Sequence, residues 1–279
     1  MKVPRVPVLC LVGLSLGAAS LPLTAATVVS DSFTDGDRTN GVDPLDIAWF
    51  TNSSTQSLAV DTSQLRITPT TSSQAVIGTM ASGVTLAVGD YIELSFTFRY
   101  PGSAPSSNTN GLRFGLYNDL GETMTGDAAN REDANSGINS LGYYANITTG
   151  SPATVTNAFY REFGGTNGVL TGADRSSAVG TTATDLGIND TDLHTAIMRI
   201  TATAAGVTLT GSIDGTTFAT GNASAPDATY RTFNQIAISS NVTATPLFID
   251  DVTVIHVPEP ATAFLGSLGI MLFFSRRRR

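Results

Sequence analysis

The stretch YIELSFTFRY, from Tyr91 to Tyr100, alternates apolar and polar side chains along its whole length. An extended strand would place the apolar members on one face: Leu94, Phe96, Phe98 and Tyr100. Glu93 and Arg99 would lie on the opposite, polar face together with the small hydroxyl residues between them. A period of two is typical of a β-strand that buries one side, so this segment predicts an antiparallel sheet over a core.

The same period recurs through the middle of the 279-residue chain. Further predicted strands cover residues 58–60, 64–67, 75–79, 111–117, 142–148, 158–163, 194–202, 207–213, 233–239 and 246–255. Turn-forming pairs separate them, and Asp214-Gly215 predicts a two-residue hairpin. No long amphipathic helix is apparent between them, and the polar residues 123–140 predict a long loop at one end. The sequence therefore predicts an all-β fold, a two-sheet antiparallel β-sandwich, over residues 27–256.

The N-terminus differs from this pattern. A basic start is followed by a short apolar run, and the small residues Thr24 to Ala26 suit a cleavage site. Residues 1–26 therefore predict a secretory signal peptide cut after Ala26, with signal peptidase and the Sec export machinery as partners. A permanent membrane anchor is the alternative. The sole cysteine, Cys10, lies inside this segment, so the mature chain has no disulfide.

The C-terminal residues 257–279 read VPEPATAFLGSLGIMLFFSRRRR. The apolar part from Ala261 to Phe274 would span roughly 21 Å as a helix, against about 30 Å for a bilayer core. The basic cluster of Arg276, Arg277, Arg278 and Arg279 predicts a cytoplasmic end. Both terminal helices are expected to lie outside the fold. A plain single-pass anchor is one reading of this tail, and a removable sorting signal is the other.

Charge sets limits on the partners of the body. Without Lys2, Arg5 and the last four arginines, the segment from Thr27 to Val257 has nine arginines against 22 acidic residues, a net charge of −13. Such a surface repels phosphates, which excludes nucleic acid as a partner.

Three stretches and the tail carry a family resemblance. The stretches are DSFTDGDRT (31–39), GLRFGLYN (111–118) and FIDDVTV (248–254). Together with the tail they resemble the PEP-CTERM sorting-domain proteins of Gram-negative bacteria, of the Verrucomicrobia or Planctomycetes kind. The bodies of such proteins look like concanavalin A-like or laminin-G-like jelly rolls.

The resemblance implies a route through the cell. An exosortase-type enzyme would read Pro258, Glu259 and Pro260 and remove the tail. The precursor would insert transiently into the inner membrane through its C-terminal helix. The product would then reside in the cell envelope or outside the cell.

A structural Ca²⁺ is a second implication of the resemblance. In similar sandwiches an acid on the last strand helps to bind calcium near the first strand, which here points to Asp250 and Asp31. The parity of Asp250 with Phe248 and Val252 predicts that it faces inward. The alternative is an aspartate at a strand bend, bonded to backbone amides. A weaker calcium-loop pattern, or a solvated turn, covers residues 35–43.

Arginines on the polar faces of strands are the candidate ligand-binding residues. They are Arg99, Arg113, Arg161 and Arg199. Tyr117 shares parity with Arg113, and Trp49, Tyr144 and Tyr160 offer stacking surface for sugars. These residues predict a face that binds polysaccharide, with uronic acids as one ligand class. The alternative is a solvent-facing set that pairs with Glu93 or Glu162.

Catalytic patterns are lacking in the sequence. After residue 26 the chain has two histidines, no Gly-x-Ser-x-Gly elbow, and no paired glutamates of the laminarinase kind; the one Gly-x-Ser-x-Gly match, Gly13 to Gly17, lies in the predicted signal peptide. We therefore expect a non-enzymatic, exported protein that binds exopolysaccharide or builds the extracellular layer. A purely structural scaffold, which would have no groove, is a further reading. A polysaccharide-active enzyme, either a glycosidase or a lyase, is the alternative.

Overall fold

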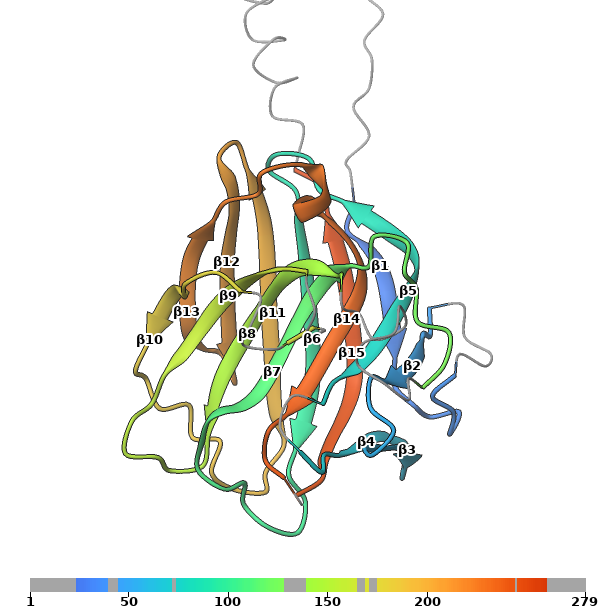
Figure 1. Ribbon diagram of the computed structural model, residues 1–279, viewed down its shortest axis with the longest axis vertical. Helices are drawn as coiled ribbons and strands as arrows, with labels where there is room; N and C mark the ends of the chain where they lie inside the picture. The colour runs from blue at the N-terminus through green and yellow to red at the C-terminus, as the bar shows by residue number, and fades with distance from the viewer. Residues whose placement is uncertain are drawn as a thin grey trace, which may run out of the picture. The chain divides into compact units, whose positions relative to one another are not determined.

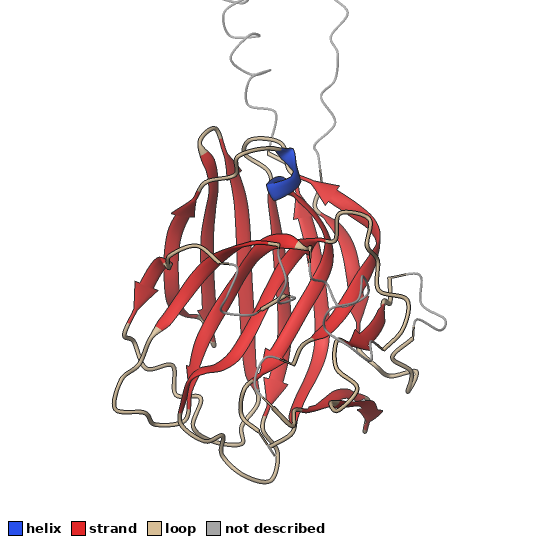
Figure 2. Cartoon of the chain, viewed as in Figure 1, coloured by secondary structure: helices blue, strands red, loops and turns tan. Residues whose placement is uncertain are grey.

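The computed structural model describes residues 24–39, 45–71, 74–127, 139–164, 169–170, 175–243 and 245–259. Within these ranges the compact unit Thr24–Glu259 consists of two antiparallel sheets packed face to face (Figure 1). Loops and one short 3₁₀ helix, η2 (Ala228–Arg231), connect the strands (Figure 2). The prediction of an all-β, two-sheet antiparallel sandwich is confirmed. The predicted terminal helices lie outside the described residues.

We call the first layer sheet A. Its path runs β13 (Thr216–Ala223), β12 (Gly206–Ile213), β11 (His194–Thr203), β6 (Tyr91–Arg99), β15 (Leu247–Val257), β4 (Gln64–Thr68) and β3 (Ser57–Asp61). The first strand, β1 (Ala26–Asp31), pairs with β15, as expected for the two ends of the chain. Because that pairing is antiparallel, Ala26 and His256 are partners, and the body begins and ends at the same end of the sandwich.

Sheet B is the second layer. Its order is β10 (Val179–Thr182), β9 (Asn157–Phe163), β8 (Leu141–Thr149), β7 (Asn108–Asn118), β14 (Thr232–Ser240), β5 (Val76–Thr85) and β2 (Ala48–Thr51). Successive strands such as β5 and β6, or β14 and β15, lie in opposite sheets, which gives the crossing connections of a jelly roll. Short strands β2 and β10 are additions to the predicted set, because four residues carry little periodic signal.

The core lies between the sheets and follows the alternation of the sequence. Strand β6 has the burial pattern iBiBiBiBi, in which Ile92, Leu94, Phe96 and Phe98 are buried. Phe96 of sheet A meets Phe114 of sheet B edge to face at 5.1 Å between ring centroids. Such contacts join the layers and fix the polar residues of each strand on the outer faces.

A β-bulge in β15 corrects one sequence expectation. Asp250 pairs with Thr97 and Thr253 pairs with Ser95, so β15 has one extra residue between these pairs. Asp251 takes a left-handed φ of 50° at this point. The bulge reverses the parity: Val252 faces the core, whereas Asp250 faces outward. The prediction that Asp250 shares an inward face with Val252 is therefore wrong.

Candidate functional site

The outer face of sheet B gathers polar and aromatic side chains from three adjacent strands. They are Arg113 and Tyr117 of β7, Tyr144 and Asn146 of β8, and Tyr160 and Glu162 of β9. The register explains the cluster, because Arg113 pairs with Asn146, and Tyr144 pairs with Tyr160. Residues directly opposite each other on antiparallel strands share one face. Three of the predicted ligand residues, Arg113, Tyr117 and Tyr144, are thus brought together.

A glycine gives Tyr117 its reach across the sheet. Gly142 stands opposite Tyr117, and a Cβ at Gly142 would lie 2.7 Å from Tyr117 Cδ1. The ring therefore crosses β8 at the only side-chain-free position there. On the far side, Tyr117 Oη donates a hydrogen bond to Glu162 Oε2 at 2.8 Å. Any larger residue at Gly142 would push the ring away from Glu162.

Leu170 covers the middle of this face. Its backbone N–H donates to Glu162 Oε2 at 2.9 Å, and its carbonyl accepts from Arg113 Nη1 at 2.6 Å. Arg113 Nε donates to Asn146 Oδ1 at 3.0 Å. Val169 and Leu170 are each 1% exposed, and with Met124 they pack on Tyr117 and Tyr144 as a second small core. The centre of the face is therefore filled by protein.

Burial changes the acid–base behaviour of this cluster. It raises the pKa of Tyr144 to about 12 and raises the pKa of Tyr117 well above its usual value. It also lowers the pKa of the Arg113 guanidinium. Both tyrosines are thus neutral hydrogen-bond donors at physiological pH, and neither is poised to accept a proton.

The rim of the cluster is accessible. Tyr160 stacks on Tyr144 with 5.3 Å between ring centroids and an angle of 25°. The Arg175 guanidinium lies 4.0 Å from the Tyr160 ring centroid, and its Nη1 donates to Tyr144 Oη at 3.0 Å. Tyr160 and Arg175 are half-buried. They form a rigid aromatic and cationic ledge, which we call the Tyr160 ledge (Tyr144, Tyr160 and Arg175).

The other predicted arginines lie elsewhere. Arg199 and Arg99 occupy the outer face of sheet A. Arg199 Nη2 bonds Glu93 Oε2 at 2.7 Å, and Arg99 Nη2 donates to Gln64 Oε1 at 2.7 Å. The Arg199–Glu93 pair matches the alternative of a solvent-facing ion pair.

Arg161 of β9 belongs to neither outer face. It shares the side of β9 that carries Phe159, Nη1 donates to the carbonyl of Ser224 at 2.9 Å, and the guanidinium lies 5.4 Å from the ring centroid of Tyr230. The expectation of one arginine face is therefore wrong. Polar faces in the two sheets of a sandwich point in opposite directions, so strands from both sheets cannot build one surface. Trp49 is fully buried and offers no stacking surface.

Asp31 and Asp250 do not meet as the calcium hypothesis requires. Asp31 pairs with Val252 on the inner face of sheet A, whereas Asp250 points outward. Asp31 accepts hydrogen bonds from the Phe33 amide at 3.0 Å and from Trp49 Nε1 at 2.8 Å. Asp250 accepts from the Asp251 amide at 2.8 Å. These contacts match the alternative of carboxylates bonded to neighbouring groups of the protein, and burial raises the pKa of Asp31 to about 6.

Other acidic residues are also committed to local contacts. Within the described ranges, no group of three or more His, Cys, Asp or Glu residues is arranged to hold a metal ion. Asp35 accepts from the Asp37 amide and Asp37 accepts from the Thr39 amide, as in a solvated turn. Residues 40–43 of the calcium-loop pattern lie outside the described residues.

The predicted sorting motif begins directly after β15. Glu259 donates its amide hydrogen to Asp90 Oδ1 at 2.9 Å, which holds the chain against the β5–β6 turn. Pro260, the apolar tail, Arg276 to Arg279 and residues 1–23 lie outside the described residues. Among the residues that are described, no helix has the length and apolar character needed to cross a membrane.

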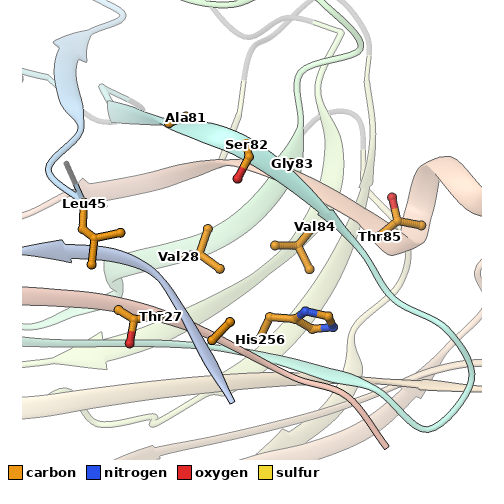
Figure 3. A pocket seen from close by; sticks show the side chains of 10 residues that line it. Thr27, Val28, Leu45, Ala81, Ser82, Gly83, Val84, Thr85 and His256 are labelled. Carbon is orange, nitrogen blue, oxygen red and sulfur yellow. The ribbon is translucent and has the colours of Figure 1, made fainter. Parts of the chain in front are cut away.

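Hollows on the described surface were not expected from the sequence. One of about 420 Å³ lies between β1 and β5, where Val28, Leu45 and Val84 line it beside His256 (Figure 3). A second of about 300 Å³ lies on the outer face of sheet A over β11, β12 and β13. Arg175 and Leu170 were also missed, because both lie in a connection without periodic signal.

No known protein family matches the sequence, and no curated protein is similar to it. Solved structures with a similar fold include a carbohydrate-binding module from Bacillus subtilis, with 13% identity, a TM-score of 0.42, and coverage of 74% of this chain and 94% of that one. A lectin from Griffonia simplicifolia has 14% identity and a TM-score of 0.47, covering 81% and 98%. An endo-1,3-β-glucanase from Streptomyces sioyaensis has 15% identity and a TM-score of 0.48, covering 86% and 99%.

Proposed function

We propose that this protein is exported to the cell envelope or the extracellular matrix and binds a neutral polysaccharide there without chemical turnover. The observation that carries the proposal is the Tyr160 ledge. A half-buried tyrosine that stacks on a second tyrosine and carries a guanidinium over its ring presents a fixed, planar surface on which a sugar ring can stack while its hydroxyls find hydrogen-bond partners. The remaining residues of the face hold this ledge in place.

Non-catalytic binding is favoured over hydrolysis by the distribution of acids. The seven strands of sheet B contain one acidic residue, Glu162, which already accepts hydrogen bonds from Tyr117 and Leu170. Glycoside hydrolysis ordinarily needs two carboxylates on either side of the scissile bond. A second carboxylate would have to come from outside these strands.

A lyase reaction is disfavoured by the tyrosines. A tyrosine that removes a proton from a sugar needs a pKa lowered toward neutrality. Burial instead raises the pKa of Tyr144 to about 12 and also raises the pKa of Tyr117. The polysaccharide-active enzyme therefore has no supporting observation in the described part of the chain.

Charge favours a neutral ligand over a uronic acid polymer. The segment from Thr27 to Val257 carries a net charge of −13, which repels polyanions. Arginines that would bind a uronate are already engaged: Arg113 with Leu170 and Arg199 with Glu93. Neutral polysaccharides avoid this repulsion and still offer rings for stacking.

The binding test uses a panel of soluble neutral and acidic polysaccharides in affinity electrophoresis with the full chain. We expect retardation by at least one neutral polymer, and loss of that retardation in Tyr160→Ala. Phe163→Ala is the matched control, because Phe163 is an exposed aromatic residue of the same strand beneath another arginine, Arg161. Equal retardation of Tyr160→Ala and wild type, or binding to none of the polymers, would overturn the proposed function.

Export and C-terminal processing are tested by a separate experiment. The leader, the Pro258-Glu259-Pro260 motif and the arginine-rich end support export followed by exosortase-type processing. Mass spectrometry of the protein from its native cells should find a C-terminus near this motif. An intact Arg279 would instead indicate a simple anchor.

A further inference from the structure

A bulge in β13 shapes the hollow on the outer face of sheet A. Gly211 of β12 pairs with Ala219, but the next residue, Ser212, pairs with Thr217, so β13 has one extra residue. Phe218 and Ala219 both face the core as a result. The outward residues Thr217 and Thr220 are then three positions apart instead of the usual two. The gap between them opens into the hollow of about 300 Å³.

Four residues with hydroxyl groups, from strands β12 and β13, line this hollow. They are Thr210, Ser212, Thr217 and Thr220. In the part of the chain that the structure describes, none of these four hydroxyls makes a hydrogen bond to another protein atom. Each is therefore available as both donor and acceptor for a ligand.

A fixed ion pair and one apolar side chain complete the wall. Arg199 donates from Nε and Nη2 to Glu93 Oε2 at 2.8 and 2.7 Å, and its guanidinium lies 4.3 Å from the ring centroid of Tyr91. The pairing and the stacking hold both charged groups in one geometry. Glu93 and Arg199 both line the hollow, so the pair offers it an acceptor and a donor. Ile197 supplies an apolar patch beside them.

We propose that this hollow is a second saccharide-binding site, which takes one sugar unit of a neutral polysaccharide. Sugar rings carry alternating hydroxyls, which need donors and acceptors, and C–H surfaces, which need an apolar contact. The hydroxyls, the paired charges and Ile197 provide all of these without a net charge. The site stands on sheet A and so does not depend on the Tyr160 ledge of sheet B.

Two such sites would change what the protein does with its ligand. Outer faces of a sandwich point away from each other, so one molecule would hold two polysaccharide chains on its opposite sides. The protein would then bridge chains in a matrix instead of merely coating one.

The experiment follows both sites in one set of NMR spectra of the isotope-labelled full chain. The probes are the methyl glycosides of glucose, galactose, mannose and N-acetylglucosamine at millimolar concentration. The Ile197 methyl groups report on the hollow, and the Tyr160 ring reports on the ledge. Saturable shifts of the Ile197 signals by at least one glycoside are the expected result.

The variants Thr210→Val and Thr201→Val form a matched pair. Both threonines point outward from sheet A, and valine keeps the shape and the strand preference, but Thr210 alone of the two lines the hollow. Thr210→Val should weaken the binding reported by Ile197 about tenfold, whereas Thr201→Val should leave it unchanged. An equal effect of the two variants would overturn the site.

Each pattern of shifts separates this inference from the proposed function. Shifts at Tyr160 with none at Ile197 overturn the hollow and support the ledge. Shifts at Ile197 with none at Tyr160 support the hollow and overturn the ledge. Shifts at neither group overturn both.

Discussion

The outer faces of the two sheets carry similar residue types but differ in their surroundings. In β6 of sheet A, buried and half-buried residues alternate along the whole strand. In β7 and β8 of sheet B, both sides are buried along most of their length. Each face contains an arginine, a glutamate and a tyrosine in proximity. On sheet A this set is Arg199, Glu93 and Tyr91, and on sheet B it is Arg113, Glu162 and Tyr117.

Residues that pack over the outer face of sheet B account for this difference in burial. Leu170 and Met124 lie over sheet B and turn a polar face into an interior, whereas the set on sheet A remains in contact with water. Interactions of the same chemical type are weak where water competes and strong where it does not. The centre of the sheet B face is thus committed to holding its own cover, and its rim, the Tyr160 ledge, is the part that remains accessible; the face of sheet A is in contact with water.

The largest difference in stability between the two faces should appear when the glutamate of each face is removed in turn. Glu162→Ala leaves the Tyr117 hydroxyl and the Leu170 amide without their acceptor, and Arg113 without a nearby negative charge. We expect a loss of about 3 to 5 kcal/mol in the free energy of unfolding. Glu93→Ala on the open face should cost about 0.5 kcal/mol.

Urea denaturation of the two variants and wild type measures the difference. Equal losses would show that the two faces are equally exposed to water in solution and would contradict the account of the cover.

The strands of both faces were predictable from the sequence for a local reason. Alternation, as in residues 91–100, depends only on which side of a strand each residue takes. Turn residues such as Asp214-Gly215 act through their own backbone and are equally local. All the strand segments predicted from alternation lie on observed strands.

Which residues share an outer face was not predictable, because it depends on contacts between residues far apart in the sequence. Assignment of a strand to one sheet or the other decides whether Arg113 and Arg199 point the same way, and no local pattern records it. Bulges in β15 and β13 shift parity by one residue. Leu170 covers sheet B from a connection without periodicity. The residues of the Tyr160 ledge were therefore only partly found, and the hollow was missed.

A second, smaller effect concerns a carboxylate on the covered, inner face of sheet A. Burial raises the pKa of Asp31 from 3.8 to about 6. The native state therefore holds this proton more tightly than the unfolded chain does. The stabilisation is complete below about pH 4 and is lost as the pH rises through about 6, for a total of up to about 3 kcal/mol.

Asp31→Asn tests this sign, because asparagine stays neutral and its oxygen can still accept from Trp49 Nε1. Relative to wild type, the variant should gain up to about 3 kcal/mol between pH 4 and pH 7 in urea denaturation. Asp61→Asn, at a half-exposed carboxylate beside Arg66, is the matched control for the loss of one negative charge. A constant difference between Asp31→Asn and wild type would mean that Asp31 is as solvated as Asp61.

A third effect isolates one hydroxyl on each face. Tyr117→Phe removes the hydrogen bond to the buried carboxylate of Glu162 and should cost about 1 kcal/mol or more. Tyr91→Phe removes a hydroxyl but keeps the ring beneath Arg199, so its cost should be close to zero. Thermal unfolding followed by circular dichroism is sufficient to rank them. A greater loss of stability in Tyr91→Phe than in Tyr117→Phe would mean that the face of sheet A, and not that of sheet B, is the covered one.

The smallest effect is expected at the bulge that turns Asp250 outward. Asp251 is exposed and adopts a φ of 50°, a conformation that glycine takes without strain and a β-branched residue strongly resists. Asp251→Gly should therefore raise the free energy of unfolding by about 0.5 kcal/mol, and Asp251→Val should lower it by about 1 kcal/mol. Thr253→Val, on the same strand beyond the bulge, should have almost no effect. If valine were tolerated equally at both positions, β15 would run without the extra residue in solution. Asp250 and Val252 would then share a face, and the inner and outer faces of sheet A would have to be reassigned along the first half of that strand.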